Sequence, residues 1–341
     1  MRQRTYLLSA AAVTIVVAVL LFVQLAPRGA RRTGDCSLSE LGVASLPGTT
    51  GRIDHMTVSN GLGLLVVAAR DNNSIAIVNV AKMTLNRTIS GFSLPQAVVF
   101  VRGDKALVVT NGGDGTVSLI NTMDFRKLAM LKLPSNADNL DFDSSSGLLY
   151  VGYGEGGVGI INTTDWSLLR SIQLLGHPEG LRVDMNRSLV FVNIPAGNYI
   201  AVLNKTNGEV LGNLPVTNGT GIFPMALDSV HHLLFVGSRS PHELVVINAI
   251  SGAEITRVSM PGDADDIFYD SANSCVYISS GQGYVTVVKE VGPNSYQLVQ
   301  SIATYPGART SFLDSKLHLY FLAAPQQQSQ PARIIAYQVG S

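Results

Sequence analysis

Charged residues are scarce in this sequence, at 14% of its 341 residues, whereas 46% are hydrophobic. A chain of this length and composition can bury a large core and is not intrinsically disordered. Basic and acidic residues number 24 each, but five basic residues and one acidic residue precede Cys36, which leaves 19 basic and 23 acidic residues after it. This slightly acidic remainder lacks the basic surface that binds phosphate backbones, so we expect no nucleic-acid partner.

Cysteines and the common catalytic motifs are also lacking. The sequence has two cysteines and no Cys-x-x-Cys, Gly-x-Ser-x-Gly or His-Glu-x-x-His pattern, which removes the usual support for thiol redox, serine hydrolase and zinc protease activities. Cys36 and Cys275 lie far apart in sequence, and two unpaired thiols are favoured over a disulfide. Gly152, Gly154 and Gly157 match G-x-G-x-x-G, but we expect a hairpin turn because no helix follows to bind a pyrophosphate.

One long stretch carries no charge at all. Residues 6–25 are mostly Ala, Val, Leu and Ile, and as a helix they are long enough to cross a bilayer of roughly 30 Å. We therefore expect a cytoplasmic segment at 1–5, a transmembrane signal-anchor or signal peptide at 6–25 and a linker at 26–36. An uncleaved signal-anchor is favoured, because no small-x-small cleavage site is evident. The globular part would then be membrane-anchored outside the cytoplasm, at the cell surface or in the periplasm, or secreted if the signal is cleaved.

What the sequence does contain is a repeat of roughly 42 residues that recurs seven times between Ile53 and Ser341. Its clearest copies read FDSSSGLLYV, VDMNRSLVFV, LDSVHHLLFV, YDSANSCVYI and LDSKLHLYFL. Each copy divides into four short strands separated by polar turns. The middle strands are nearly continuous apolar runs, as in strands that are covered on both faces. A repeat at this period whose sheets must stack to bury both faces predicts a β-propeller.

The expected architecture is thus an all-β, seven-bladed propeller of four-stranded antiparallel blades over residues 37–341. The seventh copy supplies three strands, and an unpaired strand precedes the first copy. We expect this N-terminal strand, within residues 37–47, to complete the last blade beside residues 332–341, because an incomplete blade would leave an open edge.

The second copy carries the resemblance to a known family. KALVVTNGGDGTVSLINTMDFRKLAML resembles the YVTN-type β-propeller repeat, which has a Tyr-Val-Thr-Asn strand, a Gly-rich hairpin and a Thr-Val-x-Val-Ile-Asp strand. Leu107 to Asn111 stands where that signature stands, with Leu in place of Tyr. The resemblance implies the fold over residues 37–341. For function it implies only a range, from exported proteins of no known activity to lactonase-like enzymes and quinoprotein dehydrogenase-like subunits, so function must be argued from a site.

Polar residues that recur at one position in five of the seven copies are interpreted as scaffold. One set precedes a turn, where Asp bonds to nearby backbone N–H groups: Asp143, Asp184, Asp228, Asp270 and Asp314. A second set ends the third strand of the first five copies: Asn79, Asn121, Asn162, Asn204 and Asn248. Because these residues repeat at one position, we expect structural rather than catalytic roles for them.

Polar residues that differ between copies form the candidate site. Alignment places one column where the innermost strands begin, at the mouth of the central channel: Asp54, Gln96, Asp138, Glu179, Phe223, Asp265 and Arg309. The next column adds His55, Asn139 and Asp266, and neighbouring loops on the same face add Arg70 and Arg239. All of these except Phe223 are candidate ligand-binding residues.

Three interpretations of this funnel remain open. Crowded carboxylates raise one another's pKa unless a cation intervenes, so Asp54, Asp138, Glu179, Asp265 and Asp266 are candidate ligands for Ca²⁺ or Mg²⁺. Alternatively, His55, Glu179 and Arg309 are candidate catalytic residues for hydrolysis of a lactone or ester. The third interpretation is that polar residues merely solvate a water-filled channel.

The funnel and the family resemblance together suggest three functions. The favoured one is a membrane-tethered, externally facing propeller that binds a ligand or a protein partner through its upper face and funnel without catalysis. The alternative is a lactonase-like or metal-dependent hydrolase at the acidic funnel mouth. A third, suggested only by the resemblance, is a partner subunit of an exported redox complex.

Overall fold

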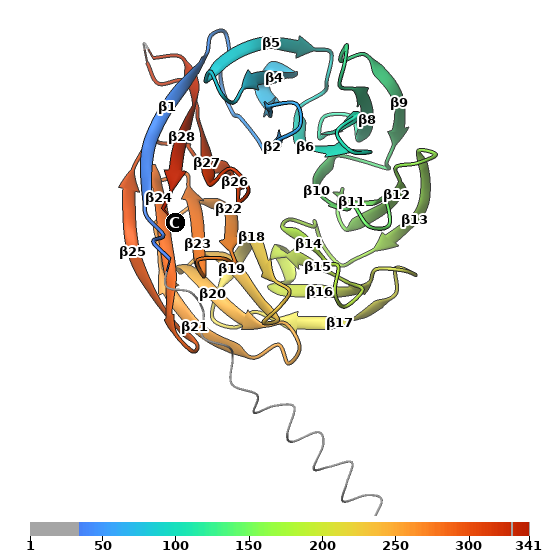
Figure 1. Cartoon of the computed structure of the whole chain (residues 1–341). Coiled ribbons are helices and arrows are strands. Elements are labelled where there is room, and N and C mark those ends of the chain that lie inside the picture. The colour runs from blue at the N-terminus through green and yellow to red at the C-terminus, as the bar shows by residue number, and fades with distance from the viewer. Residues whose placement is uncertain (1–33, 329, 341) are drawn as a thin grey trace, which may run out of the picture. The chain divides into compact units, whose positions relative to one another are not determined.

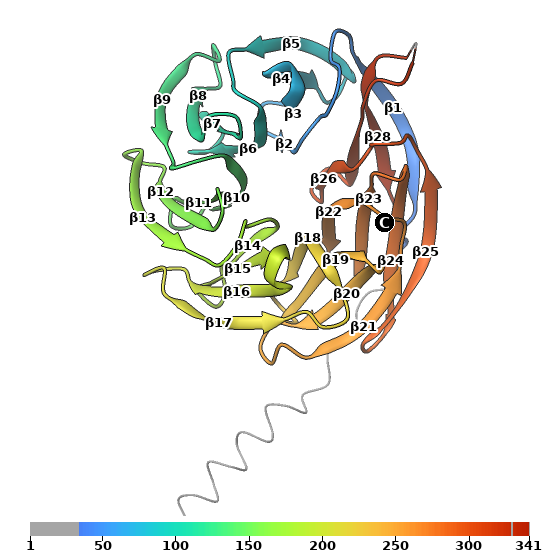
Figure 2. The ribbon, with the colours of Figure 1, turned by 180° about the vertical axis from the view of Figure 1, so that it is seen from behind.

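The computed structural model describes residues 34–328 and 330–340. In this part of the chain, 28 strands form seven four-stranded antiparallel sheets. Figures 1 and 2 show the sheets arranged as blades around a central channel. The predicted all-β, seven-bladed propeller is confirmed.

The first three blades are built from consecutive strands, ordered from the channel outward. Blade 1 contains β2 (Met56–Ser59), β3 (Leu64–Ala69), β4 (Ser74–Asn79) and β5 (Thr84–Ser90). Blade 2 contains β6 (Pro95–Val101), β7 (Ala106–Asn111), β8 (Thr116–Asn121) and β9 (Lys127–Lys132). Blade 3 contains β10 (Ala137–Asp143), β11 (Leu148–Tyr153), β12 (Gly157–Asn162) and β13 (Ser167–Gln173).

The next three blades follow the same order. Blade 4 contains β14 (Leu181–Asp184), β15 (Leu189–Ile194), β16 (Tyr199–Asn204) and β17 (Val210–Pro215). Blade 5 contains β18 (Thr220–Asp228), β19 (Leu233–Ser240), β20 (His242–Asn248) and β21 (Glu254–Ser259). Blade 6 contains β22 (Ala264–Asp270), β23 (Cys275–Ser280), β24 (Tyr284–Gly292) and β25 (Ser295–Ala303). Two single-turn 3₁₀ helices, η1 (Arg70–Asn72) and η2 (Pro195–Gly197), interrupt the hairpins of blades 1 and 4.

Blade 7 combines both ends of the described chain. Its strands are β26 (Thr310–Asp314), β27 (Leu319–Ala324) and β28 (Ala332–Val339), and β1 (Leu38–Leu46) is the outermost. β1 and β28 pair antiparallel, with Leu38 opposite Val339 and Leu46 opposite Ala332. β1 therefore covers the edge that β28 would otherwise expose.

A disulfide lies beside this closure. Cys36, just before β1, is bonded to Cys275 at the start of β23 in blade 6, with 5.9 Å between their Cα atoms. The expectation of two unpaired thiols was wrong. Because β1 is the outer strand of blade 7, the residues that precede it reach the neighbouring blade, and this brings the two cysteines together.

Burial explains why the middle strands are continuous apolar runs. Every residue of β7 is buried, whereas β9 at the rim of the same blade has no buried residue. The core is shared between neighbouring blades: one cluster contains Val66 and Ala68 of blade 1 together with Leu107 and Val109 of blade 2. Each blade thus buries its faces against its neighbours, as the repeat predicted.

The recurring aspartates and asparagines act as scaffold, which confirms their predicted role. Oδ1 of Asp143 accepts a hydrogen bond from the backbone N–H of Ser145, and Asp314 accepts one from Lys316 in the same way. At the end of the third strands, Asn121 accepts a hydrogen bond from the N–H of Met123. The equivalent contacts of the other repeated residues are also present at Asp184, Asp228, Asp270, Asn79, Asn162, Asn204 and Asn248. The G-x-G-x-x-G match lies in the β11–β12 hairpin, as expected.

The predicted transmembrane segment at residues 6–25 lies outside the described residues, as do the predicted segment at 1–5 and most of the linker at 26–36. In the described part of the chain, no helix has the length and apolar character needed to span a membrane.

Candidate functional site

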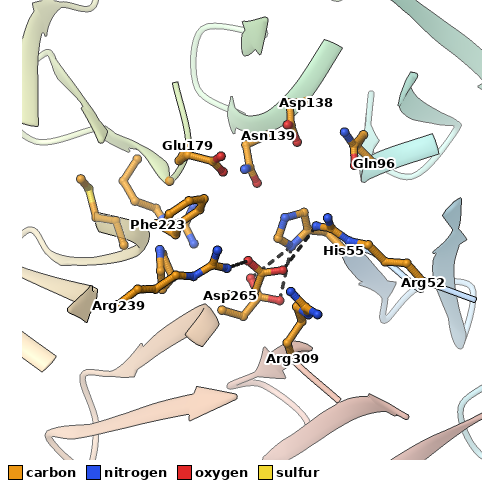
Figure 3. A pocket seen from close by; sticks show the side chains of 15 residues that line it. Arg52, His55, Gln96, Asp138, Asn139, Glu179, Phe223, Arg239, Asp265 and Arg309 are labelled. Carbon is orange, nitrogen blue, oxygen red and sulfur yellow. Dashed lines mark hydrogen bonds and ion pairs between the residues drawn. The ribbon is translucent and has the colours of Figure 1, made fainter. Parts of the chain in front are cut away.

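The channel mouth holds a cavity of about 110 Å³ with residues from all seven blades in its wall. Figure 3 shows the side chains that line it. The column aligned from the sequence supplies six of them: Gln96, Asp138, Glu179, Phe223, Asp265 and Arg309. Of the second column, His55, Asn139 and Asp266 also line the cavity. The alignment therefore located the funnel correctly, while the role of its residues remains a prediction.

Arginines neutralise Asp265. Arg239 donates a hydrogen bond from Nη2 to its Oδ1 at 2.9 Å, and Arg52 lies 3.4 Å from its Oδ2. Burial raises the pKa of Asp265, and the Arg52 and His55 cations oppose that rise. The Arg239 guanidinium also stacks on the Phe223 ring, 3.6 Å from its centroid, a favourable cation–π geometry. These contacts hold one wall of the funnel in place.

Asp54 is fully buried and is not among the residues that line the cavity. Its carboxylate lies 3.2 Å from Nη2 of Arg52, 3.6 Å from Nε2 of His55 and 3.8 Å from Nε of Arg70. Burial raises the pKa of Asp54 to about 6, against the opposing effects of His55 and Arg52. Asp54 therefore lies behind the funnel wall as a shared counter-charge for Arg52, His55 and Arg70.

His55 is held by a second carboxylate. Nδ1 of His55 lies 3.2 Å from Oδ1 of Asp266, and Oδ2 of Asp266 accepts a hydrogen bond of 2.8 Å from the backbone N–H of Ser311. Burial lowers the pKa of His55, but the Asp266 carboxylate more than offsets this and the pKa is raised to about 10. His55 is therefore an imidazolium at neutral pH.

Arg309 and Arg70 have partners of their own. Arg309 points into the funnel but pairs with Asp263, with Nη1 3.0 Å from Oδ2. Arg70 donates hydrogen bonds to Gln96 at 3.1 Å and to Asp71 at 2.8 Å. Arg70 is not one of the cavity-lining residues, whereas Arg239 is.

Asp138 and Glu179 differ from Asp54 and Asp265, because neither of them has an arginine within ion-pair distance among the described residues. Both contact one imidazole: Nε2 of His177 lies 3.2 Å from Oδ2 of Asp138 and 3.7 Å from Oε1 of Glu179. Burial and the neighbouring Asp138 carboxylate raise the pKa of Glu179, and the hydrogen bond to Asp138 raises the pKa of His177. In the view of Figure 3, Asp138 and Glu179 lie on one side of the funnel, and Asp265 and Arg309 on the other.

The three candidate catalytic residues do not form one constellation. His55 pairs with Asp266, Glu179 with His177, and Arg309 with Asp263. Within residues 34–328 and 330–340, no hydrogen bond or ion pair joins any two of the three. They share a cavity wall, but they lack the mutual contacts of a base, an acid and an anion-binding group that act together.

Sequence reasoning missed four charged residues that complete the site: His177, Asp263, Arg52 and Arg182. His177 and Asp263 each lie two residues before a column residue, Glu179 and Asp265, and Arg52 stands two before Asp54. The charged residues two positions before the aligned column were thus visible in the sequence, in the loops that lead into the innermost strands. Arg182 stands near the start of β14, three residues after Glu179.

A second cavity, of about 370 Å³, lies further along the channel. It shares His55, Asn139, Arg182 and Asp266 with the funnel, so these four side chains form the waist between the two cavities. Its other lining residues are largely apolar, including Leu140, Val183, Leu227, Ile267 and Phe312.

The fold and site define a seven-bladed β-propeller, a fold that commonly serves as a protein-binding scaffold. No protein-family model and no curated protein matches the chain, so the YVTN resemblance remains a prediction. Among solved structures, the chain is similar to Kuenenia stuttgartiensis hydrazine synthase, with a TM-score of 0.72 at 13% identity over 82% of this chain and 95% of that one. It is also similar to a chain of a mitotic checkpoint complex, with a TM-score of 0.74 at 13% identity over 100% of both chains. At this identity the likeness shows the fold alone.

Proposed function

We propose that this protein is a membrane-tethered, extracytoplasmic binding module whose funnel receives one polar side chain or chain end of a protein partner, without catalysis. The observation that carries this proposal is the small, charged cavity at the channel mouth. At about 110 Å³ it falls well below the ~300–1,000 Å³ of sites that enclose a small-molecule ligand. A protruding group of a larger partner fits such a cavity, and the surrounding face of the propeller supplies the remaining contact area.

The funnel is organised before any partner arrives. Arg239 is fixed between Phe223 and two aspartates, and Arg309 is fixed by Asp263. Side chains that are already ordered lose little entropy on binding. Arg52 also pairs with Asp54 and Asp265 but is more exposed, with 40% of its side chain accessible beside the funnel, and this supports a role in the first contact with a partner.

The state of His55 favours binding over hydrolysis. A general base needs a free nitrogen lone pair near the working pH, whereas the pKa of His55 is raised to about 10. Hydrolysis by His55, Glu179 and Arg309 would require these residues to break their separate pairings first.

Two observations support an extracytoplasmic location. Residues 6–25 form an uncharged segment long enough to cross a membrane. The Cys36–Cys275 disulfide is of the kind that persists in oxidising compartments and is rare in the cytosol. Together they favour a propeller held outside the cytoplasm by its N-terminal segment.

The test is capture of partners by the full-length protein in native membranes, using chemical cross-linking and mass spectrometry. We expect Arg52→Gln to lose a partner that the wild type captures. Arg126→Gln is the matched control, because Arg126 lies in the β8–β9 turn on the opposite face with 71% of its side chain exposed. Capture of the same partners by wild type and Arg52→Gln would refute binding through the funnel. Turnover of any member of a lactone and ester panel by purified protein would refute the absence of catalysis.

A further inference from the structure

Three side chains on one wall of the funnel bring metal-binding atoms together. Among residues 34–328 and 330–340, Asp138, His177 and Glu179 form the only group of three His, Cys, Asp or Glu residues whose donor atoms all lie within 4.8 Å of one another. Nε2 of His177 is 3.2 Å from Oδ2 of Asp138 and 3.7 Å from Oε1 of Glu179. A tetrahedral ion with bonds of about 2.0–2.1 Å spaces its ligands about 3.3 Å apart. Two of the three separations are near that spacing and all three donor atoms lie within 4.8 Å of one another, so small side-chain movements would bring them to the distances that one ion requires.

The orientation of His177 is set from outside this group. Nδ1 of His177 contacts the carbonyl oxygen of Gly154. A carbonyl oxygen only accepts, so Nδ1 carries a hydrogen and Nε2 is directed toward the two carboxylates. Histidines that bind metals are fixed in this way by a second acceptor. Because the pKa of His177 is raised by its hydrogen bond to Asp138, a metal ion would replace a proton on Nε2. Three electron-rich atoms facing one point require either a proton or a metal ion between them.

The backbone also fixes the three positions before any ion binds. The carbonyl oxygen of Asp138 accepts a hydrogen bond of 2.7 Å from Oγ1 of Thr110 in the neighbouring blade. The N–H of Glu179 donates to the carbonyl of Asn193 at 3.0 Å. The loop that carries His177 packs through Pro178 against Gly152, where an added Cβ would lie 3.0 Å from Cγ of Pro178. Gly152 therefore permits the close approach that seats this loop.

The remaining funnel carboxylates have cationic partners. Asp265 pairs with Arg239 and Arg52, and Asp266 pairs with His55. Among the described residues, Asp138 and Glu179 form an ion pair only with His177, and Arg239 acts on Glu179 from beyond ion-pair distance. A divalent cation at this wall would replace the proton of His177 as the counter-charge of the two carboxylates.

We infer that Asp138, His177 and Glu179 bind one divalent transition-metal ion such as Zn²⁺ or Mn²⁺, with at least one coordination position open to the funnel. One imidazole nitrogen and two carboxylate oxygens suit such an ion better than Ca²⁺ or Mg²⁺, which select oxygen ligands alone. Three protein ligands leave a tetrahedral ion with a free position.

The ligand for that free position follows if the proposed function holds. An oxygen donor such as the carboxylate of a partner's side chain or C-terminus would bind the ion, and Arg52 and Arg182 line the same cavity with charge complementary to it. This part of the inference rests on the proposed function. Metal binding itself does not, because it is measured with the metal alone.

The experiment is isothermal titration calorimetry of the purified, metal-stripped full-length protein with ZnCl₂, MnCl₂, CaCl₂ and MgCl₂ in turn. We expect one Zn²⁺ or Mn²⁺ per chain, with Ca²⁺ and Mg²⁺ bound at least tenfold more weakly. His177→Gln is expected to weaken Zn²⁺ binding about 100-fold or more, since even second-shell changes at metal sites cost about 10- to 100-fold. His242→Gln is the matched control, because His242 begins β20 on the same face and its side chain is exposed.

Several outcomes would overturn the inference. Absence of Zn²⁺ and Mn²⁺ binding by the wild type would show that a proton alone occupies the space between the three side chains. Equal Zn²⁺ affinity of wild type and His177→Gln would place the metal elsewhere. If His177→Gln does not fold, pulsed EPR of the Mn²⁺-loaded wild type with ¹⁵N-labelled histidine decides the matter, because a site without histidine nitrogen coupling contradicts the assignment. The two proposals are tested independently of each other: Arg52→Gln can lose partner capture while its Zn²⁺ affinity stays equal to that of the wild type.

Discussion

Nδ1 of His55 lies 3.2 Å from Oδ1 of Asp266, and this contact joins blade 1 to blade 6 across the intervening seventh blade. Asp266 also accepts the backbone N–H of Ser311 in β26 at 2.8 Å. One buried carboxylate thus connects blades 1, 6 and 7 beside the channel. The ring of blades depends on this region, because blade 7 is the only blade in the described part of the chain that is built from both ends of the sequence.

Asp266→Asn is expected to lower the free energy of unfolding by about 3–5 kcal/mol, because it removes the closest counter-charge of the buried His55 imidazolium and leaves Asp54, 3.6 Å from Nε2, as the next one. Guanidinium denaturation at pH 7 measures the change. Asp124→Asn is the control: Asp124 lies in the exposed β8–β9 turn with 53% of its side chain accessible, and a change within about 0.5 kcal/mol is expected there. Equal stability of wild type and Asp266→Asn would show that the contact contributes little to closure.

The stability of the protein should fall in alkaline solution through His55. Its pKa is raised from an ordinary 6.5 to about 10 in the folded state, so the folded protein holds this proton more tightly than the unfolded chain. The resulting stabilisation is fully present below about pH 6.5 and is lost as the pH rises through about 10.

The comparison that isolates this contribution is wild type against His55→Gln in guanidinium unfolding at pH 6, 8 and 10. The difference in unfolding free energy should be largest at pH 6 and shrink toward pH 10, by a few kcal/mol, since each tenfold change in proton affinity is worth about 1.4 kcal/mol. The pKa of His177 is also raised, so His177→Gln is measured in parallel to separate its contribution from that of His55. A difference that grows with pH would contradict the assigned pairing of His55 with Asp266.

The repeat determined how much of the fold and of the funnel could be predicted from the sequence. Blade number, the scaffold roles of Asp143 and Asn121, and the position of Glu179 at the channel mouth all follow from residues that occupy one position in each copy. The Cys36–Cys275 pairing was missed because it joins a strand outside the repeat to blade 6. It could have been deduced from the closure of blade 7 by residues 37–47, since the strand's leading end then borders blade 6.

The partners of the funnel residues could not be read from the alignment. An aligned column predicts which residues surround the channel. Which of these residues form ion pairs with one another depends on the length and direction of each side chain. Asp265 and Glu179 occupy equivalent positions, yet Asp265 meets two arginines and Glu179 meets His177. The expectation of a cation among five carboxylates therefore becomes a proposal about Asp138, Glu179 and His177, because these are the described residues whose donor atoms all lie within 4.8 Å of one another.

Reduction of the Cys36–Cys275 disulfide should destabilise the attachment of β1. The bond joins residues 239 positions apart in sequence, and removing a disulfide typically costs about 2–5 kcal/mol. Hydrogen exchange should show faster exchange in β1 and β28 of the Cys36→Ser, Cys275→Ser double variant, with blades 2 to 4 unchanged. Titration of the denatured, unreduced wild type with a thiol reagent should find no free thiol, and two thiols per chain would contradict the disulfide.

Substitution of a scaffold aspartate should lower the free energy of unfolding without changing binding at the funnel. Asp143 gives the clearest test. Its buried carboxylate accepts hydrogen bonds from Ser145 and Ser146 and pairs with Nζ of Lys205 in blade 4 at 2.7 Å. Although burial alone would raise the pKa of Asp143, these contacts hold it well below its ordinary value of 3.8. Its stabilisation is therefore present above about pH 4 and is lost as the pH falls below that value.

Asp143→Asn is accordingly expected to cost about 3 kcal/mol at pH 7 and clearly less at pH 2.5, as measured by urea unfolding at the two values. Asp165→Asn changes an exposed turn carboxylate that bonds to Ser167, and we expect it to cost less than about 1 kcal/mol at either pH. Zn²⁺ affinity and partner capture should be unchanged in Asp143→Asn, because Asp143 lies at the 1–2 turn of its blade on the face opposite the funnel. A loss of either activity in a folded Asp143→Asn protein would contradict the division between repeated scaffold residues and the residues that differ between blades.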